Sequence, residues 1–102
     1  LQFVAINESS GLAFAFRDLA ADVARLSDKP ELLNKAMTWA MEAIVLFDNF
    51  TNYETLAEVL FKMGYKKEAL WQMEKALAVM PAGNDAIAKR IHDKLNHIKN
   101  NQ

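Results

Sequence analysis

The chain has 102 residues, which is enough for one domain built around one core. Its 52% hydrophobic and 25% charged residues exclude a disordered segment, and its net charge of −1 gives no general attraction for nucleic acid. The absence of cysteine excludes disulfides, thiol catalysis and thiolate-bound metals. Only three glycines and two prolines interrupt the chain, which favours long helices over a β fold with many turns.

The first predicted helix follows residues 7–10, whose polar side chains are typical of helix starts, and runs to about Leu26. Its apolar positions recur at helical spacing, at Leu12, Phe16, Leu19, Ala20, Val23 and Leu26. Phe14 lies off this stripe. Two interpretations stay open for Phe14: a second contact face on a helix covered from two sides, or an exposed anchor for a partner or a further domain.

A firm break at residues 27–30 separates the first helix from the second. Asp28 and Glu31 predict a capping box, and Pro30 is tolerated within the first turn of a helix. The second helix should end at residues 48–49, so that residues 8–48 form a first helical hairpin. Its apolar positions are Leu32, Leu33, Ala36, Trp39, Ala40, Ala43, Ile44 and Phe47.

A second hairpin is predicted over residues 51–81. Thr51 and Glu54 predict a capping box at its start, and Gly64 is expected to end its first helix in the left-handed conformation. Its second helix should begin at Lys66 and stop at Pro81. Small residues would let the two helices approach closely, at Ala57, Ala69 and Ala76.

The last predicted helix spans residues 84–100 and begins at Asn84-Asp85. One narrow apolar stripe runs along it, at Ile87, Ile91, Leu95 and Ile98, and polar side chains cover the other side. This pattern is typical of a terminal helix that closes the open end of a repeat stack.

Residues 51–81 resemble a tetratricopeptide (TPR) repeat, a helix–turn–helix unit of roughly 34 residues. The family's large, small and proline positions are matched by Tyr53, Leu56, Ala57, Leu60, Ala69, Met73, Ala76 and Pro81. Two positions depart from the pattern, since Ala57 stands where glycine is commoner and Met73 where an aromatic residue is. Residues 8–48 resemble a degenerate repeat, because alanines occupy similar positions in their second helix.

This resemblance implies an all-α fold in which antiparallel helical hairpins form a right-handed stack over residues 1–102. It also implies a concave groove, lined by the first helix of each hairpin, that holds a peptide. The groove side would carry Thr51, Glu54, Thr55, Glu58, Phe61 and Lys62. Family members that grip a C-terminal carboxylate use Lys, Arg and Asn there, which Glu54, Thr55 and Glu58 do not match. We therefore expect no carboxylate clamp and a groove that prefers basic or apolar ligands.

A finer resemblance covers most of residues 30–80, which are similar to the helical C-terminal extensions of some bacterial thioredoxin-like proteins of the cell envelope. It would explain why the chain starts at Leu1 rather than Met and why residues 1–6 are apolar. It implies an envelope or periplasmic location in preference to the cytoplasm. The Cys-x-x-Cys of such proteins is absent from this chain, so no redox activity is implied.

The sequence shows no constellation that indicates an enzyme, a cofactor or a metal. His92 and His97 are five residues apart on a helix and point in different directions. Glu54 and Glu58 share a helical face, and we interpret them as a solvated surface pair; an acid–base role would require burial. No apolar run is long enough to span a bilayer, so we expect no membrane insertion.

The leading hypothesis is non-catalytic binding of a protein or peptide, through the helix face above or through exposed Phe14 and Trp71. Trp39 and Trp71 lie on equivalent helices, and either a contact patch or inter-repeat packing would account for them. The alternative is a structural appendage that packs on a thioredoxin-like catalytic domain. Two hairpins are fewer than the three or so repeats usually needed for stability, which suits a domain that leans on a neighbour or forms a homodimer.

Overall fold

The computed structural model describes the backbone of residues 2–101 and the side chains of residues 11–101. Within that range the chain forms five α-helices and no strand, which confirms the all-α fold class. The helices are α1 (Gln2–Leu26), α2 (Pro30–Leu46), α3 (Phe50–Lys62), α4 (Lys66–Val79) and α5 (Asp85–Asn100). No helix in the described part is long and apolar enough to cross a membrane.

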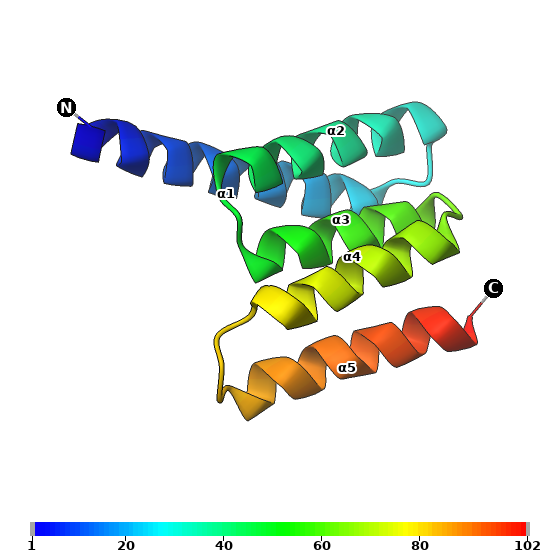
Figure 1. Cartoon of the computed structure of the whole chain (residues 1–102). Coiled ribbons are helices and arrows are strands. Elements are labelled where there is room, and N and C mark those ends of the chain that lie inside the picture. Colours follow the sequence, from blue (N-terminus) through cyan, green and yellow to red (C-terminus); the bar gives the residue numbers. More distant parts are fainter. Residues whose placement is uncertain (1, 102) are drawn as a thin grey trace.

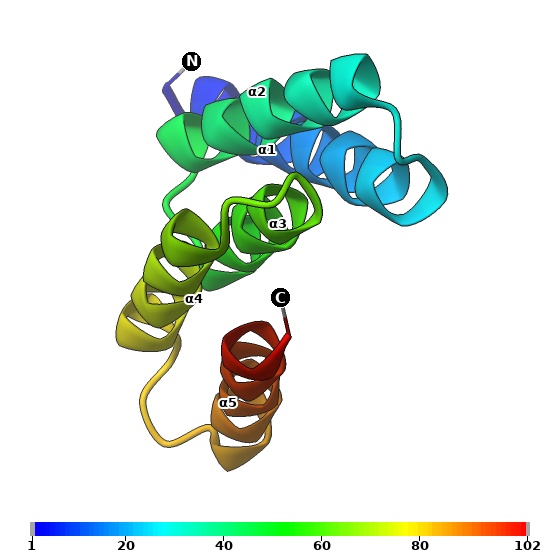
Figure 2. The ribbon, with the colours of Figure 1, turned by 90° about the vertical axis from the view of Figure 1, so that its right-hand side faces the viewer.

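The helices stack as antiparallel hairpins, as the sequence predicts (Figures 1 and 2). Helices α1 and α2 form one end of the stack, α3 and α4 the middle, and α5 the other end. Helices α1, α3 and α5 run in one direction, whereas α2 and α4 run in the opposite direction. Helix α3 is the central element, because it packs against α1, α2 and α4.

Small residues make this close stacking possible. Eight alanines from the first four helices are fully buried, at Ala13, Ala20, Ala36, Ala40, Ala43, Ala57, Ala69 and Ala76. Without side-chain bulk at these positions the helix axes approach closely, so larger side chains fill only the remaining gaps. The largest of these fully buried side chains are Met73, Ile91 and Val59.

The buried side of α1 matches the predicted stripe only in part. Ala20 of the stripe is fully buried, and Phe16 and Val23 are half-buried. Leu12, Leu19 and Leu26 of the stripe are exposed, whereas Ala13, which lies outside it, is fully buried. The alanines face inward because α2 and α3 both approach α1 on that side. The leucines therefore lie on a side of α1 that no other helix covers.

Three predicted helix ends are confirmed. Gly64 has φ +92°, and the hydrogen bonds from Tyr65 N to Leu60 O (2.9 Å) and from Gly64 N to Phe61 O (3.0 Å) complete a Schellman cap on α3. Helix α4 ends at Val79, with Met80 as its C-cap and Pro81, which cannot continue a helix, directly after it. The side chain of Asn84 accepts a hydrogen bond from the Ile87 N–H (3.1 Å) and so begins α5.

Three predicted helix starts are wrong. Helix α1 begins at Gln2, so residues 7–10 lie inside it. Helix α3 is capped by Asn49, whose Oδ1 accepts from the Thr51 N–H (2.8 Å), and not by Thr51 itself. Helix α2 has Lys29 at its N-cap position and no side-chain cap, although its proline does lie in the first turn.

The two failed capping boxes have different causes. At α3, Asn49 takes the N-cap position, and Glu54 is buried against cations of α5. At α2, Lys29 occupies the N-cap position, and the 92% exposed Asp28 lies 3.2 Å from Lys62 Nζ. An exposed ion pair contributes little, so the position of the helix start, and not a stronger partner, leaves Asp28 without a capping role.

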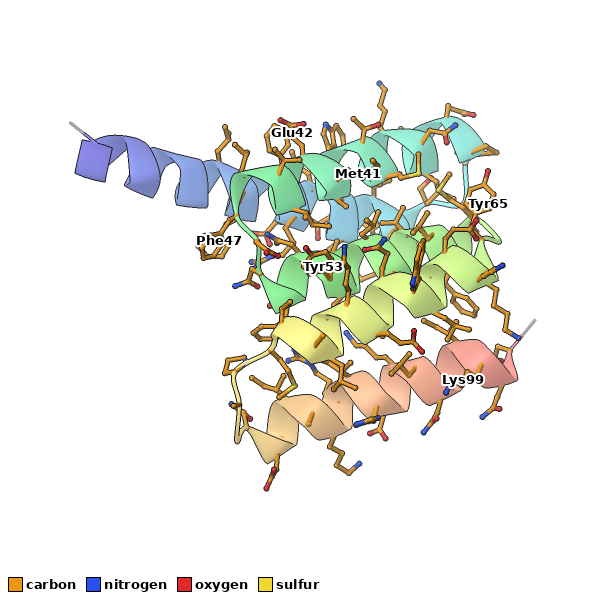
Figure 3. All side chains as sticks on the ribbon, in the orientation of Figure 1. Met41, Glu42, Phe47, Tyr53, Tyr65 and Lys99 are labelled. Carbon is orange, nitrogen blue, oxygen red and sulfur yellow. The ribbon has the colours of Figure 1, made fainter. Side chains whose placement is uncertain are left out.

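Side chains of the central hairpin also cap the C-termini of three other helices. The last carbonyls of a helix lack partners inside it and carry the negative end of its dipole, so cations and amide donors stabilise them. Three side chains do this: Lys62 Nζ bonds Ala24 O of α1, Asn52 Nδ2 bonds Ala43 O and Phe47 O after α2 (3.2 and 2.8 Å), and Lys66 Nζ bonds Lys99 O of α5 (2.9 Å). Figure 3 shows Tyr65 and Lys99 at the same end of the molecule, where this last contact forms.

Candidate functional site

A groove of about 740 Å³ lies between the C-terminal halves of α1, α3 and α5. We call it the concave groove. Its lining comprises Ala21, Ala24 and Arg25 of α1, Glu58, Phe61 and Lys62 of α3, Asp93, Lys94, His97 and Ile98 of α5, and Met73 of α4. Because α1, α3 and α5 run in the same direction, their final turns lie at the same end of the stack, the end that faces the viewer in Figure 2.

The floor of the concave groove is apolar. Phe61 projects from α3 and packs edge-on against the ring of His97, with ring centroids 5.7 Å apart and an interplanar angle of 73°. The small side chains of Ala21 and Ala24 line the α1 side. A large aromatic ring beside small residues leaves space for an apolar side chain from a ligand.

The rim of the concave groove is charged and nearly balanced. Its lining includes three cations, Arg25, Lys62 and Lys94, and two carboxylates, Glu58 and Asp93. Within the described residues, Arg25 pairs with Asp22 of its own helix (3.0 Å). This lining gives no support to the expected preference for basic ligands.

Glu54 is buried, which overturns its interpretation as half of a solvated pair. Its side chain is 3% exposed, and α5 covers it with two cations. Arg90 Nη2 lies 2.7 Å from Oε1, and Lys94 Nζ lies 3.0 Å from Oε2. Lys94 also reaches the exposed Glu58, at 2.8 Å from Oε1. Both oxygens of Glu54 thus accept from cations, a geometry that holds a carboxylate in place rather than presenting it to a substrate.

The ammonium of Lys94 is held in its charged form by this cluster. Partial burial lowers the pKa of Lys94, but the hydrogen bonds that it donates to Glu58 and Glu54, with their Coulomb attraction, outweigh burial and raise the pKa overall. The cluster therefore fastens the start and middle of α5 to α3, beside the concave groove.

The structure brings three of the seven predicted binding residues together. Glu58, Phe61 and Lys62 line the concave groove side by side. Glu54 and Thr55 lie in the interior, where the Thr55 hydroxyl donates to Thr51 O (3.0 Å). These two side chains are therefore not available to a ligand in the groove.

The other two predicted residues lie away from the groove. The Phe14 ring is exposed but packs edge-on against Phe47 (6.1 Å between centroids), and the Arg17 guanidinium stacks over it at 4.8 Å. Trp71 is 70% exposed on α4. Trp39 packs against the core, so the two tryptophans do not form an exposed pair.

Sequence reasoning missed the groove residues contributed by α1 and α5, above all Arg25, Lys94 and His97. The polar side of α5 has the pattern of a solvated face, and only its position beside α3 shows that part of it borders a groove. The repeat pattern could have indicated these residues, because it predicts that the first helices of successive hairpins share one concave side.

No protein-family model, curated protein or solved structure matches this chain. The geometry of the groove and the surfaces of the helices therefore carry the functional argument.

Proposed function

We propose that this domain is a non-catalytic protein–protein interaction module of the TPR type, and that the concave groove holds a peptide or helix of its partner. One observation supports this most: three parallel helices surround an apolar floor with a charged rim. Such grooves bind a short segment by burying one or two apolar side chains, while charges at the rim set its direction.

The size of the groove suits this role. Its volume of about 740 Å³ would accept a few side chains of a peptide but not a folded surface. Phe61 provides the apolar contact, and the adjacent Lys62 and Glu58 can bond a ligand's backbone or charged groups. The predicted TPR resemblance supports the same location, since the first helices of the hairpins line the groove.

A catalytic role has less support from the geometry. Burial of Glu54 is the feature that an acid–base role would need, yet its two oxygens are engaged by Arg90 and Lys94. The exposed neighbour Glu58 shares Lys94. This arrangement is typical of a structural ion-pair cluster that joins two helices.

A peptide-display selection with the purified domain tests the proposal. We expect selected peptides to share an aromatic or aliphatic anchor, and we expect Ala21→Trp, which fills the groove, to weaken their binding at least about tenfold, or roughly 1.4 kcal/mol. The matched control is Ala78→Trp, which adds the same ring to an exposed position on α4. Recovery of no peptides, or equal binding by the two variants, would contradict a ligand site in the groove.

The exposure of Trp71 favours the second candidate, a helical appendage that packs on a thioredoxin-like catalytic domain. A tryptophan that is 70% exposed on the outer side of α4 presents a large apolar surface that such a domain could cover. Sequencing the gene upstream of Leu1 tests this candidate directly. A preceding domain that bears Cys-x-x-Cys, whose stability falls on Trp71→Ser in the joined protein, would support it; another helical hairpin in that place would contradict it.

A further inference from the structure

The first hairpin presents an apolar surface on the side that faces away from α3. Leu12, Leu19 and Leu26 are spaced seven residues apart on α1, and all three are exposed. Seven residues make nearly two full turns of an α-helix, so these side chains lie in one row along the helix. Leu26 is the most open of them, at 77% exposed.

Helix α2 carries a matching row. Leu32, Trp39 and Leu46 are also spaced seven residues apart, and all three are half-buried. Because α2 runs antiparallel to α1 across the short turn of residues 27–29, each leucine of α1 lies near the level of one member of this row. The three levels are Leu26 with Leu32, Leu19 with Trp39, and Leu12 with Leu46. We call these six residues the outer face.

No element in the described part of the chain covers the outer face. Helices α3, α4 and α5 all lie on the opposite side of the first hairpin (Figures 1 and 2). Figure 3 shows Glu42 on the side of α2 that points away from α3. Rows of apolar residues at seven-residue spacing on two adjacent helices are the pattern that packs against a further pair of helices in a bundle.

We propose that the outer face binds a second copy of this chain, so that the two first hairpins form a four-helix arrangement around a two-fold axis parallel to the helices. A two-fold interface uses the same surface on both chains, so one self-complementary face is sufficient. In this arrangement α1 of each copy lies against α2 of the other, with both turns at the same end.

Charges beside the outer face select this orientation. Asp22 lies on the edge of α1, where its exposed carboxylate already pairs with Arg25 of the same helix (3.0 Å), and Lys35 lies on the edge of α2 near the same level of the hairpin. An exposed pair within one helix is weak, so Asp22 can also attract a cation across the interface. Parallel alignment places Asp22 opposite Lys35 of the partner subunit, twice in the dimer. The parallel alignment also places Glu42 opposite Ala15 of the partner subunit, so Glu42 meets no second carboxylate across the interface. The reversed alignment would place Asp22 opposite apolar residues of α1 and would lose both pairs.

Sedimentation velocity over about a hundredfold range of concentration tests the proposal. We expect a reversible dimer of the wild-type chain whose Kd rises at least about tenfold on Leu19→Lys, because the centre of a small interface contributes most of its affinity. A wild-type chain that stays monomeric throughout, or a dimer that Leu19→Lys leaves unchanged, would overturn the proposal. A monomer that captures a different protein through these leucines would overturn it as well.

A matched pair of variants excludes general effects of added charge. Leu26 (77% exposed) and Val45 (79% exposed) lie at equivalent places near the ends of α1 and α2, but only Leu26 belongs to the outer face. Leu26→Lys should weaken the dimer, whereas Val45→Lys should leave its Kd unchanged. Circular dichroism checks that each variant keeps its helices; equal effects of the two substitutions would count against the outer face.

Charge reversal tests the orientation. Asp22→Lys or Lys35→Asp alone should raise the dimer Kd roughly 2- to 30-fold, since two exposed ion pairs are lost and like charges then meet. The double variant exchanges the two charges and should restore the wild-type Kd. Failure of the double variant to restore dimerisation would overturn the parallel arrangement.

Discussion

The two ends of the helical stack differ in which side chains their outer helices bury and which they expose. At one end α5 buries Ile91, Leu95 and Ile98 against the rest of the domain and shows a charged side outward. At the other end α1 buries small alanines and leaves Leu12 and Leu19 exposed. We call these the closed end and the open end. An end cap needs a polar outer side, and only the closed end has one.

The difference also concerns how each end is joined to the central helix α3. The first hairpin meets α3 through small residues in close contact, such as Ala20 and Ala57. Helix α5 packs on α4 and reaches α3 through long charged side chains that converge on Glu54. The closed end thus combines an apolar contact with an ion-pair cluster, so changes in charge should act there more than at the open end.

The largest expected effect is the loss of Ile91 at the closed end. Ile91→Ala leaves a cavity beside α4, since the side chain is fully buried, and should lower the free energy of unfolding by about 2–5 kcal/mol. Leu19→Ala at the open end removes an exposed side chain and should change it by less than about 0.5 kcal/mol. Urea denaturation at concentrations where the chain is monomeric measures both. Similar losses of unfolding free energy from the two variants would show that Leu19 is buried rather than exposed at the open end.

The ion-pair cluster gives the next largest effect. Glu54→Gln keeps the shape of the side chain but removes the charge that Arg90 and Lys94 share, and it should cost about 1–3 kcal/mol. Glu58→Gln removes an exposed pair with Lys94 and should cost no more than about 0.5 kcal/mol. Amide exchange should rise mainly in α5 of the Glu54 variant. Uniform exchange across all helices would show that the cluster does not act locally.

The sequence predicts the fold well wherever one local signal decides the outcome. Gly64 ends α3 because a left-handed residue was needed there, and the predicted stripe of α5 is the buried one. The pattern fails where two signals compete. In α1 the predicted stripe combined Ala20 with three leucines. The close approach of α2 and α3 buries Ala20 together with Ala13 and leaves the leucines exposed.

The candidate site was only partly predictable for a related reason. Glu58, Phe61 and Lys62 were found because the repeat pattern marks one side of α3 as concave. The same pattern included Glu54, which is instead buried by cations that come from residues 90 and 94. No local signal at Glu54 reports partners that far along the chain, so its burial follows only from the position of α5.

Replacing two of the glycines by alanine should change the stability of the domain in opposite directions. Gly64 has φ +92°, and Gly64→Ala should cost about 1–2 kcal/mol, because a Cβ is strained in that conformation even though no atom crowds it. Gly11 lies within α1 near the open end, with space around it, and Gly11→Ala should stabilise the domain by about 0.5–1 kcal/mol. Thermal melts of the two variants compare them. A destabilising Gly11→Ala would show that α1 is closely covered at this position.

The smallest expected effect is a loss of stability at alkaline pH, to which Lys94 of the closed end and Tyr53 of the central helix α3 contribute. The pKa of Lys94 is raised in the folded domain, so the stability that its charge provides is complete below the ordinary lysine value of 10.5 and is lost as the pH rises through the folded value. The pKa of Tyr53 is also raised, by its hydrogen bond to Asp48, by burial and by the charge of that carboxylate. Folding therefore favours the neutral phenol, and this stability is likewise lost as the pH rises above 10.0.

Two variants separate these contributions. The urea midpoint of the wild-type domain should stay level below about pH 10 and fall as the pH rises further, because lysine and tyrosine titrate ordinarily near this value and both folded pKa values lie above it. Lys94→Met removes the group at the closed end and Tyr53→Phe the one beside the α2–α3 loop, so each should make the fall shallower. Their effects should add, because the two groups share no partner. If Lys94→Met leaves the pH dependence unchanged, its ammonium does not fasten α5 to α3, and the closed end depends on its apolar stripe alone.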